Sequence, residues 1–381
     1  MSAGRRLSLI AILSSVAAYG MGMGLTLPLL SLMLERMGVA GSVNGMNLAT
    51  AGLAALVVTP FVPGWIRRFG TAEFLAASLV IAAISLIAIY MVPSLWLWFP
   101  VRFVLSAALN GLFVVTEYWI NRLADEHNRG RFIAVYAICM SGSFGIGPTI
   151  LQVIGTHGFA PFGMGAALLL LALAPALAAR RTAPQIEERE TGSILSVLGL
   201  APVAFTAAFV FGAIDAGMVG LLPVYAVRMG YDEAAAALIV TAIAAGSILF
   251  QLPLGYLADR MNRRTLLALC ASTGVVGTAL VPLTISTPAL LYFVLAIWGG
   301  LILGVYSVGL TLLGEQVKSG RLATANAGYV MFYCFGLLLG PAAEGVALDL
   351  WNPHGLLVVL AGICAAYVAY LILSGRRAKA A

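Results

Sequence analysis

Hydrophobic residues run along this chain in long blocks that short polar segments separate. Most blocks reach or exceed the roughly 20 residues that an α-helix needs to cross a lipid bilayer. Glycine and proline occur inside several blocks, which lipid-embedded helices tolerate. The pattern predicts twelve spanning helices, at residues 7–33, 43–66, 72–92, 95–120, 131–153, 160–179, 196–227, 234–257, 265–286, 289–314, 323–347 and 355–374.

The composition indicates a membrane protein. Hydrophobic residues make up 61% and charged residues 9% of the 381 residues, and the mean hydropathy is +1.01; a soluble protein carries about 25% charged residues. No polar block is long enough for a separate soluble domain. We therefore expect an all-α polytopic protein in a lipid bilayer. The net charge of +6 does not indicate a nucleic-acid partner, because the cations are scattered at the ends of the predicted helices.

The positions of arginine and lysine predict the orientation, because cytoplasmic segments are enriched in them. With a cytoplasmic N-terminus, only Arg36 and Arg228 lie outside, and Arg102 lies within a span. The pattern thus favours both termini in the cytoplasm, and we expect a bacterial inner membrane. The remaining cations would lie inside: Arg5, Arg6, Arg67, Arg68, Arg122, Arg129, Arg131, Arg180, Arg181, Arg189, Arg260, Arg263, Arg264, Lys318, Arg321, Arg376, Arg377 and Lys379.

The chain divides into two similar halves. The longest polar segment, residues 180–195, is predicted to link a six-helix bundle of residues 1–179 to a second of residues 196–381. Parallel repeats of this kind enclose a site near the middle of the membrane, which opens to each side in turn. Three patterns repeat in register: GLTLPLLSLMLERMG (24–38) with GLLPVYAVRMG (220–230), GLFVVTE (111–117) with GLTLLGE (309–315), and a tyrosine twelve residues before a proline, at 136 and at 329.

A charged loop between the eighth and ninth spans carries the most specific motif. GYLADRMNRR (255–264) has the pattern Gly-x-Leu-Ala-Asp-Arg-x-x-Arg-Arg and resembles the signature loop of the major facilitator superfamily of transporters. The resemblance extends over the whole chain through the twelve spans, the linker and the repeat. It implies that the loop forms part of a cytoplasmic gate, whose charges pair with neighbouring helices.

The first half departs from this pattern. GWIRRFGTAEF (64–74) has Arg68 where the second half has Asp259, so the gating contacts are expected to be asymmetric and the first loop to serve mainly topology. GLLLGPAAEG (336–345) and its weaker partner SGSFGIGP (141–148) are similar to a glycine-proline element of the superfamily's antiporters, which carry it in the fifth helix. This resemblance favours efflux.

Two glutamates occupy equivalent places at the predicted cytoplasmic ends of spans four and ten. Glu117 and Glu315 are each followed by basic residues, and they resemble the family's gate glutamates, which pair with loop arginines. Direct binding of substrate or protons is the alternative role. The predicted cytoplasmic gate therefore comprises Glu117, Arg129, Arg131, Asp259, Arg260, Arg263, Arg264, Glu315 and Arg321.

Arg102 lies inside the fourth predicted span, where it resembles an arginine of many proton-linked family members. Its repeat partner is Gly300, so the fold does not require the charge. Asn110, eight residues further along the same predicted helix, lies within about a quarter turn of Arg102 around the helix axis. Arg102 is predicted either to face the pathway, where it binds an anionic group or tunes a carboxylate, or to extend its charge to the external interface.

Asp215 is the strongest candidate for coupling, because it is the single charge near the middle of the seventh predicted span. A charge there costs at least about 2.5–3.5 kcal/mol, and its repeat partner is Gly20. Burial favours the neutral form of a carboxylate, so Asp215 is predicted to exchange protons or contact substrate. A structural pair with Arg102, or a hydrogen bond that holds two helices together, is the alternative.

Other polar and aromatic residues supply possible linings of a cavity, although most are expected to pack or to lie at the membrane interface. Glu344 is a possible external gate, and Asp349 is expected to be solvated at the interface. The residues that could line a cavity are Tyr19, Asn44, Asn47, Tyr118, Trp298, Tyr306, Asn326, Tyr329 and Tyr333.

Neither a metal nor a cofactor is expected. The four cysteines lie in apolar runs without paired spacing, which is typical of small buried residues. Met21 and Met23 could suit Cu(I), but residues two apart point to different faces of a helix, and no histidine lies in a facing span. Metal-ion transport is therefore the weakest reading.

We compared three classes of function. An enzyme would need a catalytic constellation at membrane depth, and none is evident; a channel or receptor would not need the repeated loops and glutamates. Without a nucleotide-binding loop, energy must come from an ion or substrate gradient. We expect a monomeric secondary transporter that exchanges protons for an amphipathic or drug-like small molecule and exports it. Proton-coupled uptake or exchange of an anionic metabolite at Arg102 is the alternative.

Overall fold

The structure is a computed structural model, and it describes residues 3–124, 129–184, 195–317 and 321–380. Within these ranges every regular element is a helix. Twelve helical segments of the described residues are long and apolar enough to cross a membrane, the first at Gly4–Arg36 and the last at Gly355–Ser374. The predicted all-α polytopic architecture is confirmed.

Contacts within the chain define two compact units, which we describe separately. The first unit contains Met1–Met33 and Leu53–Glu188, and the second contains Leu34–Gly52 and Arg189–Ala381. Helices α1 (Ala3–Arg36) and α2 (Gly41–Val58) therefore each contribute residues to both units. Most of the linker predicted at 180–195 lies outside the described residues, and the bundle boundaries at 179 and 196 stay a prediction.

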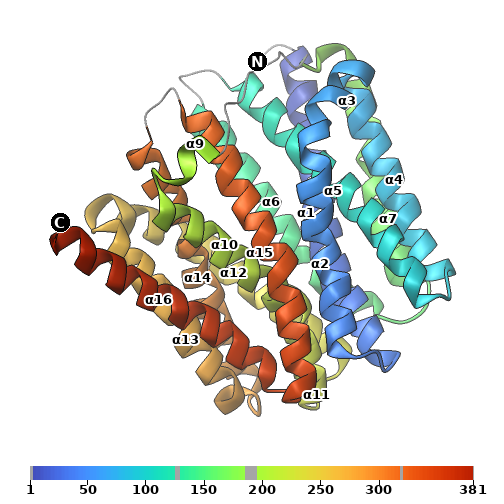
Figure 1. The fold of residues 1–381 in the computed structure, drawn as a ribbon. Coiled ribbons are helices and arrows are strands. Elements are labelled where there is room, and N and C mark those ends of the chain that lie inside the picture. The colour runs from blue at the N-terminus through green and yellow to red at the C-terminus, as the bar shows by residue number, and fades with distance from the viewer. Residues whose placement is uncertain (1–2, 125–128, 185–194, 318–320, 381) are drawn as a thin grey trace. The chain divides into compact units, whose positions relative to one another are not determined.

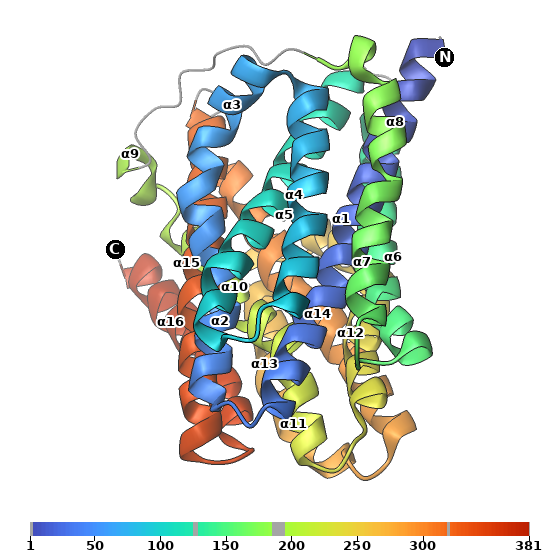
Figure 2. The ribbon, with the colours of Figure 1, turned by 90° about the vertical axis from the view of Figure 1, so that its right-hand side faces the viewer.

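In the first unit, α4 packs against α5 and α7 (Figures 1 and 2). The span predicted at 43–66 is not one continuous α-helix, because a short 3-10 turn separates α2 from α3. Pro60 and Pro63, which lack backbone N–H groups, lie in the first turns of the elements that follow. Further elements of this unit are η1 (Thr59–Phe61), α3 (Val62–Phe69), α4 (Thr71–Met91), α5 (Leu95–Leu123), α6 (Arg129–Ile154), α7 (Ala160–Leu171), α8 (Leu173–Ala178) and η2 (Arg180–Thr182).

In the second unit, the helix predicted at 196–227 is divided into three. Pro202 begins α10, and Pro223 lies in the first turn of α11 just after Leu221, where the proline cannot donate an N–H to the preceding turn. The elements of this unit are α9 (Leu195–Leu198), α10 (Pro202–Gly220), α11 (Leu222–Arg228), α12 (Glu233–Arg260), α13 (Arg263–Thr284), α14 (Pro288–Gln316), α15 (Leu322–Leu350) and α16 (Gly355–Ala380).

Helices α10 and α15 lie side by side along much of their length (Figure 1), and small residues let their backbones touch. A Cβ atom at Gly212 would lie 2.1 Å from the carbonyl oxygen of Tyr333, and one at Gly340 would lie 2.1 Å from that of Ala213. Such close approach between membrane helices depends on glycine. This contact fixes which residues of α15 face Asp215 on α10.

A similar close contact joins α12 to α14 and gives a test of the packing. A Cβ atom at Gly246 would lie 1.7 Å from the carbonyl oxygen of Ala296, whereas one at Gly255, on the same helix, would meet nothing within 4 Å. We expect Gly246→Ala to destabilise the protein by about 1–3 kcal/mol through overpacking. Gly255→Ala should leave stability unchanged or raise it slightly, because alanine favours helix. Thermal unfolding in detergent compares the two, and equal midpoints would contradict the packing described.

Candidate functional site

The carboxylate of Asp215 has a specific partner in the second unit. The hydroxyl of Tyr333, on α15, donates a hydrogen bond of 2.7 Å to Oδ2 of Asp215. Both side chains are half-buried, so each keeps part of its surface available to a ligand. A phenol that donates to a carboxylate favours its ionised form, and it fixes the direction in which the second carboxylate oxygen points.

Aromatic rings from three helices surround this hydrogen bond. Phe211, one turn before Asp215 on α10, has its ring centroid 6.0 Å from that of Tyr333 and 5.5 Å from that of Tyr306 on α14. The rings of Tyr306 and Tyr333 lie 5.5 Å apart, edge to face. Tyr329 holds this arrangement, because its hydroxyl donates to the backbone oxygen of Tyr306 at 2.6 Å. We call Phe211, Asp215, Tyr306 and Tyr333 the aromatic–carboxylate cluster.

The remaining predicted lining residues lie in different environments. Tyr329 is fully buried in the apolar core between α10, α14 and α15, and Trp298 is 2% exposed, packed where a Cβ atom at Gly277 would touch its ring. Asn44 and Asn47 on α2 are buried, whereas Asn326 is exposed. Of the predicted lining residues, the structure therefore brings only Tyr306 and Tyr333 into the cluster with Asp215. Tyr329 is buried beside the cluster and holds Tyr306 through its hydrogen bond.

Most of the predicted site residues of the first unit lie on α5 and α1. Arg102 is 3% exposed, and Asn110 donates its amide to the Thr59 hydroxyl at 2.8 Å. Glu117 is exposed and Tyr118 half-buried. Tyr19 on α1 stacks with Phe113 at a centroid distance of 5.4 Å. Arg102 therefore places a positive charge in the interior of the first unit.

Two members of the predicted cytoplasmic gate meet in the second unit. Nη1 of Arg263, at the start of α13, lies 2.5 Å from Oε1 of Glu315, near the end of α14. Asn262 caps α13 by accepting bonds from the amides of residues 264 and 265. The side chain of Arg129 lies outside the described residues. Of the other gate residues, Arg264 is half-buried, Asp259, Arg131 and Arg321 are exposed, and Arg260 lies over the ring of Tyr256.

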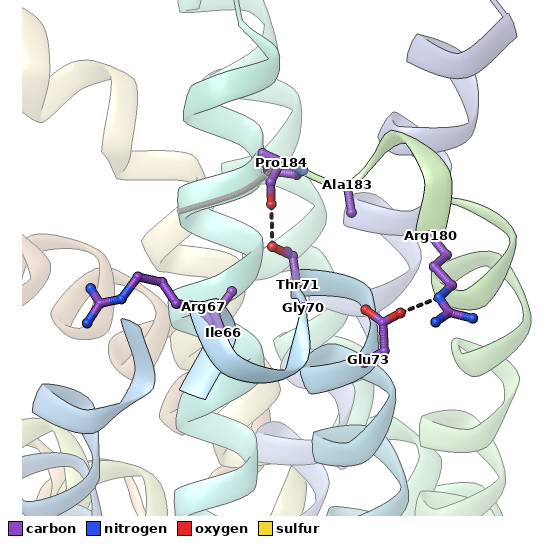
Figure 3. Close-up of a pocket in the computed structure, with 8 residues that line it drawn as sticks. All are labelled: Ile66, Arg67, Gly70, Thr71, Glu73, Arg180, Ala183 and Pro184. Carbon is purple, nitrogen blue, oxygen red and sulfur yellow. Dashed lines mark hydrogen bonds and ion pairs between the residues drawn. The ribbon is translucent and has the colours of Figure 1, made fainter. Parts of the chain in front are cut away.

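The loop of the first half, residues 64–74, makes different contacts from the loop of the second half (Figure 3). Glu73, in the first turn of α4, forms an ion pair with Arg180, and the Thr71 hydroxyl donates to the backbone oxygen of Pro184. These residues line a cavity of about 460 Å³, and Arg67 points away from the ion pair (Figure 3). Both interactions join α4 to the segment that follows α8. Their role is therefore structural, because they hold this segment against the start of α4.

Sequence reasoning missed a group of charges at the other end of the second unit. Glu35 accepts two hydrogen bonds from Arg228, at 2.7 and 2.8 Å. Arg36 pairs with Glu233 at 3.0 Å. Asp349 accepts from the amides of residues 41 and 42 at 2.6 and 2.8 Å, which satisfies N–H groups at the start of α2. We call this set, with the Leu34–Gly52 segment that it holds, the hairpin clasp.

Metal ligation finds no support within the part of the chain that the structure describes. No group of three or more histidine, cysteine, aspartate or glutamate residues there could hold a metal ion. The four cysteines are free thiols.

Comparisons with known proteins assign the family. The sequence profile of the Major Facilitator Superfamily matches residues 12–299 and, in an overlapping second match, residues 230–381. The chain belongs to the major facilitator superfamily. It is 26% identical over 336 residues to the uncharacterized MFS-type transporter YfkF of Bacillus subtilis (strain 168), a match that covers 87% of this chain and 86% of the relative. The MFS-type transporter YcaD of Escherichia fergusonii, also uncharacterized, is 26% identical and covers 86% and 84%.

Solved structures show the same fold. The nucleoside transporter NupG, as its D323A mutant, aligns with a TM-score of 0.81 at 15% identity and covers 97% of this chain and 99% of its own. A bacterial homologue of the human lysosomal transporter Spinster, in an inward-facing and occupied conformation, has a TM-score of 0.76 at 15% identity and covers 99% and 98%. The protein is thus a multi-pass bacterial membrane transporter of the secondary class and not an enzyme.

Proposed function

We propose that this transporter exchanges protons for an amphipathic small molecule that carries a positive charge, and exports it. The observation that carries the proposal is the aromatic–carboxylate cluster. A carboxylate attracts a cation, and aromatic faces bind cationic groups within about 6 Å of the ring centroid. Phe211, Tyr306 and Tyr333 lie close enough together for one cationic group to contact several rings beside Asp215.

The same cluster supports proton coupling. Asp215 is half-buried in an apolar helix, and a cation that binds beside it competes with a proton for one negative charge. The proton leaves to water when the cation binds, and it returns when the cation departs. The direction, from the cytoplasm outward, rests on the resemblance of the glycine-proline element to that of antiporters. We further propose an inner-membrane location with both termini cytoplasmic, and a monomer.

A second candidate is exchange of an anionic metabolite, which the buried charge of Arg102 favours. The two readings predict opposite charge selectivity, so a pair of probes with one shape and opposite charges separates them. Tetraphenylphosphonium and tetraphenylborate have this relation. We expect the purified transporter to bind the cation more tightly than the borate anion.

Transport itself is tested in proteoliposomes with ethidium, a fluorescent aromatic cation. An imposed pH gradient should drive ethidium against its concentration gradient, and collapsing that gradient with an ionophore should stop the movement. Preferential binding of tetraphenylborate would favour the anionic alternative. Ethidium transport at the same rate with and without the pH gradient would contradict proton coupling.

A further inference from the structure

We infer that Glu344 is a second proton-binding carboxylate of the transporter and that it shares one exchangeable proton with Asp215. The inference rests on the proton coupling proposed above and deepens it, because it states which group holds the proton that a bound cation displaces. Glu344 is not part of the aromatic–carboxylate cluster, and its carboxyl group takes no part in the hairpin clasp.

The environment of Glu344 does not suit an ionised carboxylate. The residue lies on α15 with 0% exposure. Neither carboxylate oxygen has a hydrogen-bond partner among the described residues. An ionised carboxylate that is removed from water and lacks both hydrogen bonds and a counter-charge is strongly destabilised. In the described conformation Glu344 therefore carries a proton.

A glycine on the neighbouring helix makes the space for this side chain. A Cβ atom at Gly217, on α10, would lie 1.5 Å from Oε2 of Glu344. A side chain at 217 would force the carboxyl group of Glu344 to shift from its position. The carboxyl of Glu344 thus points directly at α10, two residues along the chain from Asp215.

Among the described residues, the groups that act on the carboxyl of Glu344 include no cation. Asp215 on α10 interacts with it electrostatically, and so does the thiol of Cys364 on α16. Residues 41–58 of α2, which contact α15 through Gly45 and Pro341, include no charged side chain. On α15 itself, Asp349 is engaged by the start of α2. Within the part of the chain that the structure describes, the charged group that acts on Glu344 is therefore another carboxylate.

Two neighbouring carboxylates in apolar surroundings share protons, because ionising one disfavours ionising the other. Their environments differ: Tyr333 donates to Asp215, whereas no donor among the described residues reaches the carboxyl of Glu344. The shared proton consequently resides on Glu344 while Asp215 is ionised. When a cation binds beside Asp215, its positive charge replaces that of the proton, which leaves to solvent. The net charge of the pair and its ligand stays constant in this exchange.

The isosteric variant Glu344→Gln tests the shared proton. Proton release on binding of tetraphenylphosphonium is measured in weakly buffered detergent solution. We expect wild type to release close to one proton per bound cation and Glu344→Gln to release almost none while it still binds the probe. Glu344→Asp should restore release, because it keeps a carboxyl group. Cys364→Ser, which changes a group that interacts with Glu344 without removing a carboxyl group, should behave as wild type.

A second measurement does not need a ligand. Infrared difference spectra between acidic and alkaline pH detect protonated carboxylic acids by their carbonyl stretch, and Glu344→Gln should lose part of that band. If wild type binds none of the probes, the proposed function is wrong. The infrared band then tests by itself whether Glu344 carries a proton. Unchanged proton release or an unchanged band in folded Glu344→Gln would overturn the shared proton.

Discussion

Asp215→Asn is expected to abolish proton-driven ethidium transport and to weaken the binding of tetraphenylphosphonium at least about thirtyfold. Removal of one partner from a desolvated charge pair costs roughly 2–5 kcal/mol, and each 1.4 kcal/mol corresponds to a factor of about ten in affinity. Asparagine keeps the shape of the side chain and can still accept from the Tyr333 hydroxyl. The variant therefore removes the charge and the proton site with little change in packing.

Two further variants separate charge from geometry. Asp215→Glu keeps the carboxylate and should retain part of the coupled transport. Tyr333→Phe removes only the donated hydrogen bond, so it should lower the rate without abolishing the dependence on the pH gradient. Binding equilibria are measured by tryptophan fluorescence or calorimetry, and transport by ethidium fluorescence. Coupled transport by Asp215→Asn at the wild-type rate would rule out the role of Asp215.

Most of the fold could be predicted from the sequence because lipid imposes a simple constraint. Each spanning segment must satisfy its backbone hydrogen bonds within a helix, and apolar blocks of the required length are visible directly. The deviations lie at prolines. Pro60 and Pro223 interrupt segments that were predicted as continuous helices, because hydropathy does not reveal where a missing N–H group divides a helix.

The functional site could be predicted only in part. Asp215 was recognisable because a lone charge within an apolar span is costly. Its partner Tyr333 was one of several aromatic candidates, and the choice depends on the contact of α10 with α15 through Gly212. That the Glu344 oxygens find no hydrogen-bond partner in the described part of the chain depends on three-dimensional packing. In the sequence Arg228 is one of many charges at helix ends, which topology explains, and its pairing with Glu35 links residues 193 positions apart.

Breaking the hairpin clasp is expected to produce the second large effect. The side chains of Arg228 and Glu35 are only 15% and 18% exposed, and hydrogen bonds to charged groups stabilise by about 1.5–3 kcal/mol. Alternating access requires each side of a transporter to open in turn, and the clasp holds Leu34–Gly52 to the rest of the second unit. Arg228→Glu should therefore favour detachment of this segment by roughly 10–150-fold and slow coupled transport, because the clasped state is depleted.

A charge exchange supplies the matched control. Glu35→Arg alone should resemble Arg228→Glu, and the double variant should recover a large part of the wild-type behaviour by restoring an ion pair of opposite polarity. Recovery will be incomplete, since Arg228 also donates to Asn352 at 3.0 Å. Detachment is measured by maleimide labelling of Leu48→Cys, because Leu48 is 1% exposed and lies where a Cβ atom at Gly220 would touch it. Equal labelling rates in wild type, both single variants and the double variant would show that the clasp does not control opening.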